Sequence, residues 1–536
     1  MSPKNNPIKY FFILGNNPAL SLAEIFGLLN SGDKDFRLAG VSPQRTPARQ
    51  GCHTPTSESP ACGRGDSDGA PSQNFNLHKN ARIITFCKDF LIIELDKKID
   101  ANKLMGVLGG TIKIGIILES QNANIETRDL IEKINIDKNK KFYFGFSAYG
   151  KIGANFKRLA MEIKKKLKQD GTSSRWVISR EKQLSSVVVK KNKLVGENGT
   201  EFCVLKNKDK IFWGKTLAVQ EFEDYGQRDF YRPARDPKSG MIPPKLANMM
   251  INLARAELDF KTKNGITLLD PFCGSGTILQ EAAILGINKI IGSDLSEKAT
   301  RDSEQNLKWL EERIDISPQS ANGKSGIARI DATTSPHAGK RLNTPLDVQR
   351  LGREDSCAIS IFNSDVRKIS ELIPAGSVDL IVAEPYLGPP LSGGENENRI
   401  SQIVQELSEL YLSAFKEFKK ILKKDGCICM VWPVFAICKK NIFLPILGEV
   451  EKLGFRQVRF DSGNYVNLIF DGGCKTQFAA PAPQSPDGRL RRSTGNDGDE
   501  LKNFKKNLAD NFSERGNIVY GRDRQIVKRE IAIFKI

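Results

Sequence analysis

The second half of the chain alternates short apolar runs with amphipathic helical patterns, and this alternation restricts the fold more than any other feature. The runs are apolar throughout rather than at every second position, which is typical of parallel strands covered on both faces. We therefore expect an α/β fold with a mostly parallel, doubly wound sheet, whose ligand lies beyond the carboxyl ends of the strands. The expected strands are 266–270, 289–294, 358–365, 378–384, 427–433, 455–460 and 529–535, and the expected helices are 277–285, 297–312, about 400–422 and about 441–453.

A glycine-containing stretch, DPFCGSGT, follows the first of these strands and opens a helix. Gly274 and Gly276 permit a tight turn and a close approach of the backbone to a ligand. The helix that begins at Thr277 adds unpaired N–H groups and a partial positive charge. The stretch is neither GxGxxG nor a phosphate loop followed by lysine, so it suits a ligand with a carboxylate and a ribose. Asp270 and Phe272 complete the candidate binding residues of this turn.

Acidic residues end four consecutive expected strands. Asp270 closes the first strand, and Asp294 closes the second, where a carboxylate can accept hydrogen bonds from both ribose hydroxyls. Asp365 closes the third strand once a long polar insertion is subtracted, and we expect it to bind an adenine amino group. Glu384 closes the fourth strand. Four acids in order along one edge of a sheet predict a cofactor site.

The first half of the chain has a different pattern, a mixture of short strands and helices. We expect residues 1–225 to form an α+β domain and residues 226–536 to form the α/β domain. The run 9–14 predicts a strand. Ser21 and Glu24, three residues apart, predict a capping box that opens a helix.

A strand over 141–150 is predicted by its alternating pattern, and a helix with one apolar face is predicted over 154–168. The other face of this helix is basic. A solvated surface is one interpretation, but the net charge of +18 favours a polyanionic partner, and we expect this face to bind RNA. The candidate RNA-binding residues are Lys157, Arg158, Lys164, Lys165 and Lys168.

Three segments are rich in Ser, Pro, Gly, Asp and Arg and poor in aliphatic residues, namely 40–76, 315–357 and 474–503. Such segments cannot bury enough apolar surface to offset the entropy of ordering. We expect them to be disordered surface insertions. The alternative is that one of them is a functional arm.

Composition excludes several classes of protein. The ten cysteines form no CxxC pair and there are only three histidines, so we expect neither a disulfide framework nor a metal site. No apolar run reaches the roughly 18 residues of a membrane span, so we expect no membrane partner. The N-terminus has no signal-peptide pattern, and the expected location is the cytoplasm.

Several of these motifs resemble those of known methyltransferases. DPFCGSGT, with Asp294 and Asp365, resembles the cofactor motif of class I S-adenosylmethionine-dependent methyltransferases, which have a Rossmann-like fold. AEPY resembles the Asp/Asn-Pro-Pro-Tyr/Phe motif of enzymes that methylate exocyclic or ring nitrogens of bases. KYFFILGNNPALSLAEI, FGFSAYG, the connecting stretch GKTLAVQEFEDYGQRDFYRPARDPKSGMIPPKLANMMINLA and the closing GNIVYGRDRQIVKREIAIFK are similar to the THUMP-containing tRNA guanine N2-methyltransferases, which modify the guanine at the tenth tRNA position.

The resemblance covers nearly everything outside the insertions and implies the rest of the site. It implies S-adenosylmethionine as cofactor, tRNA as substrate and a THUMP-like RNA-binding first half. It also implies that Glu384, Pro385 and Tyr386 are catalytic: the carboxylate holds the N–H of the target amine, proline stiffens the turn and the ring stacks on the flipped base. Arg232 and Arg235 are expected to pack over the methionine end of the cofactor, or else to pair with acids.

The sequence departs from the family motif at the strand tip. Glu384 stands where the family usually has Asp or Asn, and Leu387 and Gly388 follow the ring. The extra methylene moves the carboxylate and can change which amine fits. Two alternatives therefore stay open: a DNA amino-methyltransferase acting on adenine N6 or cytosine N4, and a non-catalytic RNA-binding relative. An activating protein partner is a further possibility that the sequence does not decide.

If the insertions are dispensable, deleting 315–357 and closing the gap with a short Gly/Ser linker leaves the thermal midpoint and cofactor affinity nearly unchanged, because the segment offers little apolar surface to bury. Thermal unfolding and titration calorimetry of the deletion variant measure both quantities. Loss of solubility or of binding would show that the segment belongs to the fold.

Overall fold

The computed structural model describes most of the chain outside the expected insertions. The described residues are 7–30, 81–120, 127–132, 136–137, 140–152, 156–236, 240–258, 265–313, 358–437, 440–460, 511–522 and 525–536. The expected insertions at 40–76, 315–357 and 474–503 lie outside them. No helix within the described ranges is both long and apolar enough to cross a membrane.

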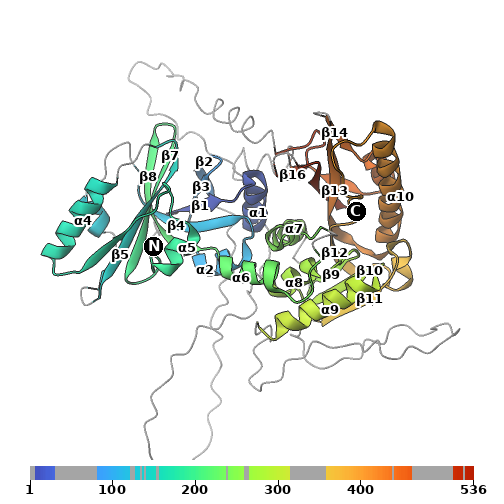
Figure 1. Ribbon diagram of the computed structural model, residues 1–536, viewed down its shortest axis with the longest axis horizontal. Helices are drawn as coiled ribbons and strands as arrows, with labels where there is room; N and C mark the ends of the chain where they lie inside the picture. The colour runs from blue at the N-terminus through green and yellow to red at the C-terminus, as the bar shows by residue number, and fades with distance from the viewer. Residues whose placement is uncertain are drawn as a thin grey trace, which may run out of the picture.

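The second half of the chain forms one sheet, called the second sheet below, with nine described strands: β9 (Thr267–Asp270), β10 (Lys289–Asp294), β11 (Ala358–Asn363), β12 (Val378–Ala383), β13 (Leu422–Ile437), β14 (Lys440–Phe443), β15 (Arg456–Val458), β16 (Ile518–Tyr520) and β17 (Val527–Lys535). The order is β11-β10-β9-β12-β13-β17-β15, with β14 paired to β13 and β16 paired to β17 (Figure 1). The first five strands of this order are parallel, and β17 is antiparallel to both of its neighbours. The predicted mostly parallel α/β sheet is confirmed.

Helices cover both faces of this sheet, as the alternating pattern predicts. They are α8 (Thr277–Ile284), α9 (Glu297–Glu311), a 3-10 helix η3 (Val366–Glu371), α10 (Glu397–Ile421) and α11 (Leu447–Lys452). The predicted helix over 441–453 is wrong in its first part. Residues 440–443 continue β13 as its antiparallel partner β14, and the helix is confined to Leu447–Lys452. A strand of four residues against a long neighbour leaves no periodic signal in the sequence.

The first half forms the other sheet, called the first sheet below, which is mostly antiparallel and has eight described strands: β1 (Ile8–Leu14), β2 (Arg82–Phe86), β3 (Phe90–Leu95), β4 (Thr111–Ser120), β5 (Phe142–Gly150), β6 (Ser174–Val177), β7 (Gly199–Asn207) and β8 (Lys210–Val219). Its order is β2-β3-β1-β4-β8-β7-β5-β6, and only β5 among these pairs in parallel, with β6 and β7. The helices are α1 (Pro18–Asn30), α2 (Ala101–Val107), α3 (Thr127–Glu132), α4 (Lys157–Gln169) and α5 (Ser186–Lys191). The predicted strand at 9–14 and helix near 154–168 are confirmed.

The predicted capping box at Ser21 and Glu24 is wrong. α1 begins three residues earlier, and Asn17 accepts the capping hydrogen bond from Leu20 N at 3.0 Å. Ser21 instead donates to the carbonyls of Asn17 and Gly110, so a local pattern that looked like a helix start serves a tertiary contact.

Three helical elements connect the sheets: α6 (Phe222–Gly226), a π-helix η1 (Gln227–Tyr231) and α7 (Pro244–Ala256). α7 packs against α1 on one side and against α8, β12 and β13 on the other (Figure 1). Its residues Leu246 to Ala254 are buried without a break. One apolar core therefore continues from α1 through α7 into the second sheet.

A buried carboxylate lies where these two halves meet. Glu24 of α1 is fully buried and accepts hydrogen bonds from Gly109 N at 2.9 Å, Gly110 N at 2.8 Å and Asn252 Nδ2 of α7 at 2.7 Å. A Cβ on Gly110 would lie 2.8 Å from both Met249 Sδ and Ser21 Oγ, so only glycine permits this approach. Burial outweighs the three hydrogen bonds and raises the pKa of Glu24 to about 7.

We predict that this carboxylate makes stability depend on pH. Because the pKa of Glu24 in the folded protein lies above its ordinary value of 4.5, the folded state is favoured most below pH 4.5, and this contribution is lost as pH rises to about 7. Glu24→Gln removes this titration and places an amide N–H against a backbone donor, which costs about 1–3 kcal/mol.

Urea unfolding of the wild type and of Glu24→Gln between pH 4.5 and 8 measures both effects, with the exposed Glu451→Gln as the matched control. Parallel pH profiles for wild type and Glu24→Gln would contradict the assignment.

Candidate active site at the carboxyl edge of the second sheet

The loop between β9 and α8 forms the floor of the site. Gly274 has φ +52° and a Cβ added there would meet no atom within 4 Å, so the backbone faces open space. Gly276 has φ +80° and is the N-cap of α8, and a Cβ there would lie 3.0 Å from Ser303 Oγ. The loop therefore presents bare backbone at a helix N-terminus, as DPFCGSGT predicts.

Asp294, at the end of β10, holds this loop in place. Its Oδ2 accepts from Gly274 N and its Oδ1 accepts from Ser296 N, each at 2.9 Å. A carboxylate offers about four acceptor positions, so each oxygen keeps capacity for a ligand hydroxyl. The next side chain, Leu295, is 71% exposed although apolar.

Asp270 is buried under the loop and accepts from Phe272 N at 3.1 Å. Burial raises the pKa of Asp270 well above its ordinary value, and the nearby negative charges of Asp294 and Glu384 raise it further. The structure thus brings these three predicted acids together at neighbouring strand ends.

Asp365 lies at the same edge but is engaged locally. β11 ends at Asn363, and Asp365 caps the 3-10 helix η3 by accepting from Arg367 N at 3.0 Å. The Arg367 guanidinium also donates to both of its oxygens, which holds the pKa of Asp365 below its ordinary value. Its predicted contact with an adenine amino group stays a prediction.

The turn after β12 carries the other predicted residues. Tyr386 is 57% exposed, and its carbonyl accepts a hydrogen bond at 3.0 Å from the hydroxyl of Tyr411, a buried residue of α10. Pro385 is buried between the acid and the ring. Glu384 is almost buried and forms an ion pair with Arg529 of β17. Burial raises the pKa of Glu384, while the charge of Arg529 lowers it.

The segment from η1 to residue 235 borders the loop on its other side. Arg232 is buried and donates to Thr277 Oγ1 at 2.6 Å, and Ala234 exchanges backbone hydrogen bonds with the side chain of Asn306 on α9. Among the described residues, Arg232 contacts Thr277, Gln280 and Met241 and not the acid that was one expectation for it. The buried ion pair of this segment is instead formed by Arg228 with Glu281 of α8, with Arg228 Nε 2.6 Å from Glu281 Oε1.

Sequence reasoning did not find Arg529, Arg228 or Tyr411. Arg529 contacts Glu384 across 145 residues of sequence, and no local pattern marks such a pair. The closing stretch resembles a known family, and that likeness does not single out this arginine.

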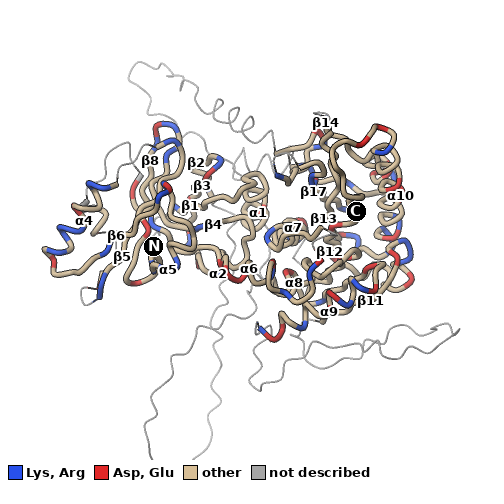
Figure 2. Tube along the Cα trace, in the orientation of Figure 1, with Lys and Arg blue, Asp and Glu red and all other residues tan. Residues whose placement is uncertain are grey.

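The basic helix α4 lies at the end of the first half that is distant from the second sheet (Figure 2). The predicted RNA-binding residues Lys157, Arg158, Lys164, Lys165 and Lys168 are all exposed, and Ala160, Ile163 and Leu167 are buried on the opposite face. Beside the start of α4 is a cavity of about 310 Å³, whose lining includes Phe146, Phe156, Trp176, Lys157, Arg180 and Lys182.

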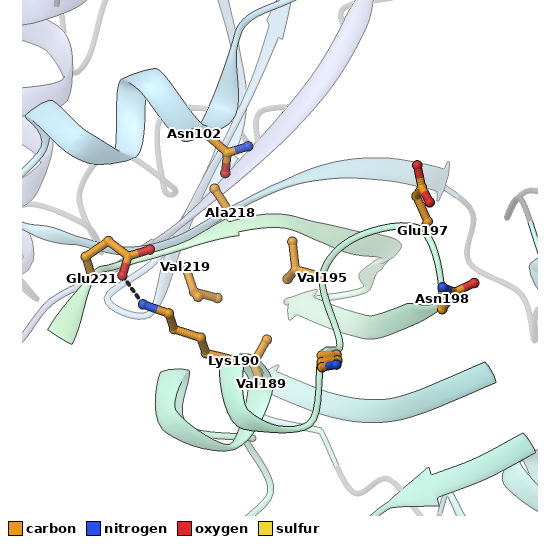
Figure 3. A pocket seen from close by; sticks show the side chains of 10 residues that line it. Asn102, Val189, Lys190, Val195, Glu197, Asn198, Ala218, Val219 and Glu221 are labelled. Carbon is orange, nitrogen blue, oxygen red and sulfur yellow. Dashed lines mark hydrogen bonds and ion pairs between the residues drawn. The ribbon is translucent and has the colours of Figure 1, made fainter. Parts of the chain in front are cut away.

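A second cavity, of about 430 Å³, lies between α2, α5 and the end of β8 (Figure 3). Val189, Val195 and Val219 contribute its apolar walls, and Lys190 forms an ion pair with Glu221 at its rim. Its charges of both signs neutralise each other, so it has no clear preference for an anion or a cation.

A nucleoside cofactor with a charged amino-acid portion fits the carboxyl edge. The open backbone at Gly274 suits the amino-acid portion. The spare acceptor positions of Asp294 suit a ribose, and the exposed apolar Leu295 suits a base. Within the described ranges no cluster of three or more His, Cys, Asp or Glu side chains is arranged to hold a metal ion.

The strand order, the glycine loop after β9 and the acids at the strand ends define the Rossmann-like fold of class I methyltransferases. Residues 231–442 match the family of RMKL-like methyltransferase domains, so this part of the chain is a methyltransferase domain.

Curated relatives match parts of the chain. The tRNA (guanine(10)-N2)-dimethyltransferase of Methanothermobacter thermautotrophicus is 36% identical over 101 residues, which are 19% of this chain and 27% of that protein. The enzyme of the same name from Methanocaldococcus jannaschii is 28% identical over 204 residues, 36% of this chain and 54% of that protein. These matches confirm the resemblance to the tRNA guanine N2-methyltransferases, and the chain spans about half or less of the lengths of these relatives.

Among solved structures, TrmN from Thermus thermophilus aligns with 99% of this chain and 100% of that chain, with a TM-score of 0.41 and 13% sequence identity. A predicted N6-adenine-specific DNA methylase from Listeria monocytogenes aligns with 64% of this chain and 80% of that chain, with a TM-score of 0.32 and 14% identity.

Proposed function

We propose that this protein transfers a methyl group from S-adenosylmethionine to the exocyclic N2 amine of a guanine in tRNA. The observation that carries the proposal is the strand tip of Glu384, Pro385 and Tyr386, which presents a carboxylate and an exposed ring beside the glycine loop of a methyltransferase domain. The curated relatives, which are named tRNA guanine N2-dimethyltransferases, support guanine in tRNA as the acceptor.

The cofactor would be held by the edge of β9, β10 and β11. The proposed contacts are Asp270, Phe272, Gly274, Gly276, Thr277, Asp294 and Asp365. When bound, the cofactor supplies a methyl group on a positively charged sulfur. The N-terminus of α8 would attract its carboxylate, Asp294 would accept from its ribose, and Leu295 would offer an apolar contact to its base.

The strand tip would act on the acceptor. An exocyclic amine is a weak nucleophile because its lone pair is delocalised into the ring. A hydrogen bond from the amine to Glu384 localises that lone pair, and Tyr386 stacks on the base. Glu384 would then accept the proton that the amine nitrogen releases when it takes the methyl group that the cofactor would supply.

The first half would bind the tRNA as a THUMP-like domain over residues 1–225, joined to a methyltransferase domain over 226–536. α4 exposes five cations, and one of them, Lys157, lines a cavity that also contains Phe156, Trp176, Arg180, Lys182 and the acid Glu181. Aromatic rings and cations together suit single-stranded RNA, since bases stack on rings and phosphates attract cations. A tRNA substrate would be consistent with the expected cytoplasmic location.

We predict that Asp294→Ala weakens S-adenosylmethionine binding by about 1–3 kcal/mol, because ribose hydroxyls lose an acceptor and the Gly274 loop loses its clamp. Titration calorimetry measures the affinity, and Glu304→Ala, on an exposed position of α9, is the control. Equal affinities in a folded Asp294→Ala protein would place the ribose contact elsewhere.

We predict methylated guanosine as the product when the protein, labelled S-adenosylmethionine and bulk tRNA are incubated and the RNA is digested to nucleosides. Duplex DNA is the parallel substrate and should yield none. Glu384→Ala should abolish the product while calorimetry still detects cofactor binding, because the carboxylate holds the amine and not the cofactor.

Methyladenine or N4-methylcytosine in DNA would favour the DNA amino-methyltransferase. Undiminished product with Glu384→Ala would reject the role of this carboxylate. Cofactor binding without product from either polymer would favour a non-catalytic RNA-binding relative.

A further inference from the structure

The carboxylate of Glu384 is held by one cation, and the contact leaves one of its oxygens available. Arg529 Nε donates to Glu384 Oε1, and the two side chains are 14% and 9% exposed. Among the described residues no donor bonds to Glu384 Oε2. The ion pair thus uses one oxygen of the acid from the side of β17.

The strand pairing explains why the two side chains meet. Val382 of β12 and Ile531 of β17 belong to the core on one face of the sheet, and side chains two residues along each strand point the same way. Glu384 and Arg529 occupy those positions. The residue of β13 opposite Arg529 is Pro433, which has no ionisable group, so the guanidinium can reach across it.

We propose that Arg529 is a positioning residue for methyl transfer, which fixes the carboxylate of Glu384 so that Oε2 is presented to the target amine. This inference rests on the proposed function for its effect on the reaction, but the ion pair itself can be tested without it. Asp or Asn at this position has a shorter reach, so a glutamate needs an additional contact to restrict its extra torsion.

Arg529 is a charged neighbour that favours the ionised form of Glu384. Asp270 of β9 is a nearby acid, and Tyr411 of α10 adds no positive charge, while Arg529 forms the one ion pair of this carboxylate among the described residues. Burial already raises the pKa of Glu384. Removing Arg529 takes away the opposing influence, so the pKa must rise further.

Loss of Arg529 should change how kcat depends on pH. The reaction needs the ionised carboxylate, which is present above its pKa. Without Arg529 the acidic limb of the kcat profile therefore moves to higher pH. A tenfold loss of kcat at a fixed pH below that limb corresponds to a rise of one pH unit in the pKa.

The experiment uses the full chain with four substitutions: Arg529→Gln, Arg529→Lys, Glu384→Gln and Lys528→Gln. Lys528 is the neighbouring cation on β17 and serves as the charge-matched control. Protein labelled with ¹³C at the glutamate carboxyls is titrated by NMR, and the resonance missing from Glu384→Gln identifies Glu384. The kcat for tRNA is measured from pH 5 to 9, and cofactor affinity is measured by calorimetry.

We expect Arg529→Gln to raise the pKa of Glu384 and to shift the acidic limb by the same amount, with about a tenfold or greater loss of kcat at the lower pH values and unchanged cofactor affinity. Arg529→Lys keeps a positive charge and should raise the pKa of Glu384 less than Arg529→Gln does. Lys528→Gln should leave the pKa of Glu384 and the kcat profile as in the wild type. An unchanged Glu384 titration in a folded Arg529→Gln protein overturns the inference. So does an unchanged pH profile with only a lower thermal midpoint, which would mean a merely structural role.

If the wild-type protein methylates no RNA, the proposed function fails by itself. The NMR titration then still decides the inference: a raised pKa in Arg529→Gln supports the held carboxylate, and an unchanged pKa rejects it.

Discussion

The burial of α7 between the two halves is the constraint on which the rest of the structure depends. The buried side-chain amide of Asn252 on this helix donates to Glu24, Asn248 and the carbonyl of Val107. These bonds tie α1, α2 and α7 to one another. The site at the second sheet and helices α1 and α2 of the first half therefore share one apolar core, which runs through α7. The basic helix α4 packs on a separate apolar cluster of the first half.

The carboxyl edge of the second sheet concentrates negative charge that the fold must manage. Asp270 is buried and its pKa is raised, Asp294 is bound to loop N–H groups, Asp365 is bound to Arg367, and Glu384 is bound to Arg529. Each acid thus has a different partner. The partners differ in kind: Asp270 and Asp294 accept from backbone N–H groups of the loop region, Asp365 caps η3, and Glu384 forms an ion pair.

Much of the fold could be predicted because its signals are local. The apolar runs from 266 to 384 and the helices between them follow from periodicity, and their boundaries agree within a few residues. The errors have physical causes. Ser21 and Glu24 have the spacing of a capping box, yet tertiary partners at Gly109 and Gly110 use their side chains instead. β14 is a strand only because β13 extends beside it.

The sequence by itself determined the class of fold, the glycine loop and the acids at the strand ends, since strand period and strand-end position are local properties of the chain. Only the tertiary structure decided which groups those acids meet. Arg529 reaches Glu384 because β17 is inserted antiparallel beside β13, and Glu24 is buried because α7 packs on α1. Both pairs join residues more than one hundred positions apart, and a carboxylate's ionisation is set by such neighbours and by burial rather than by its place in the sequence.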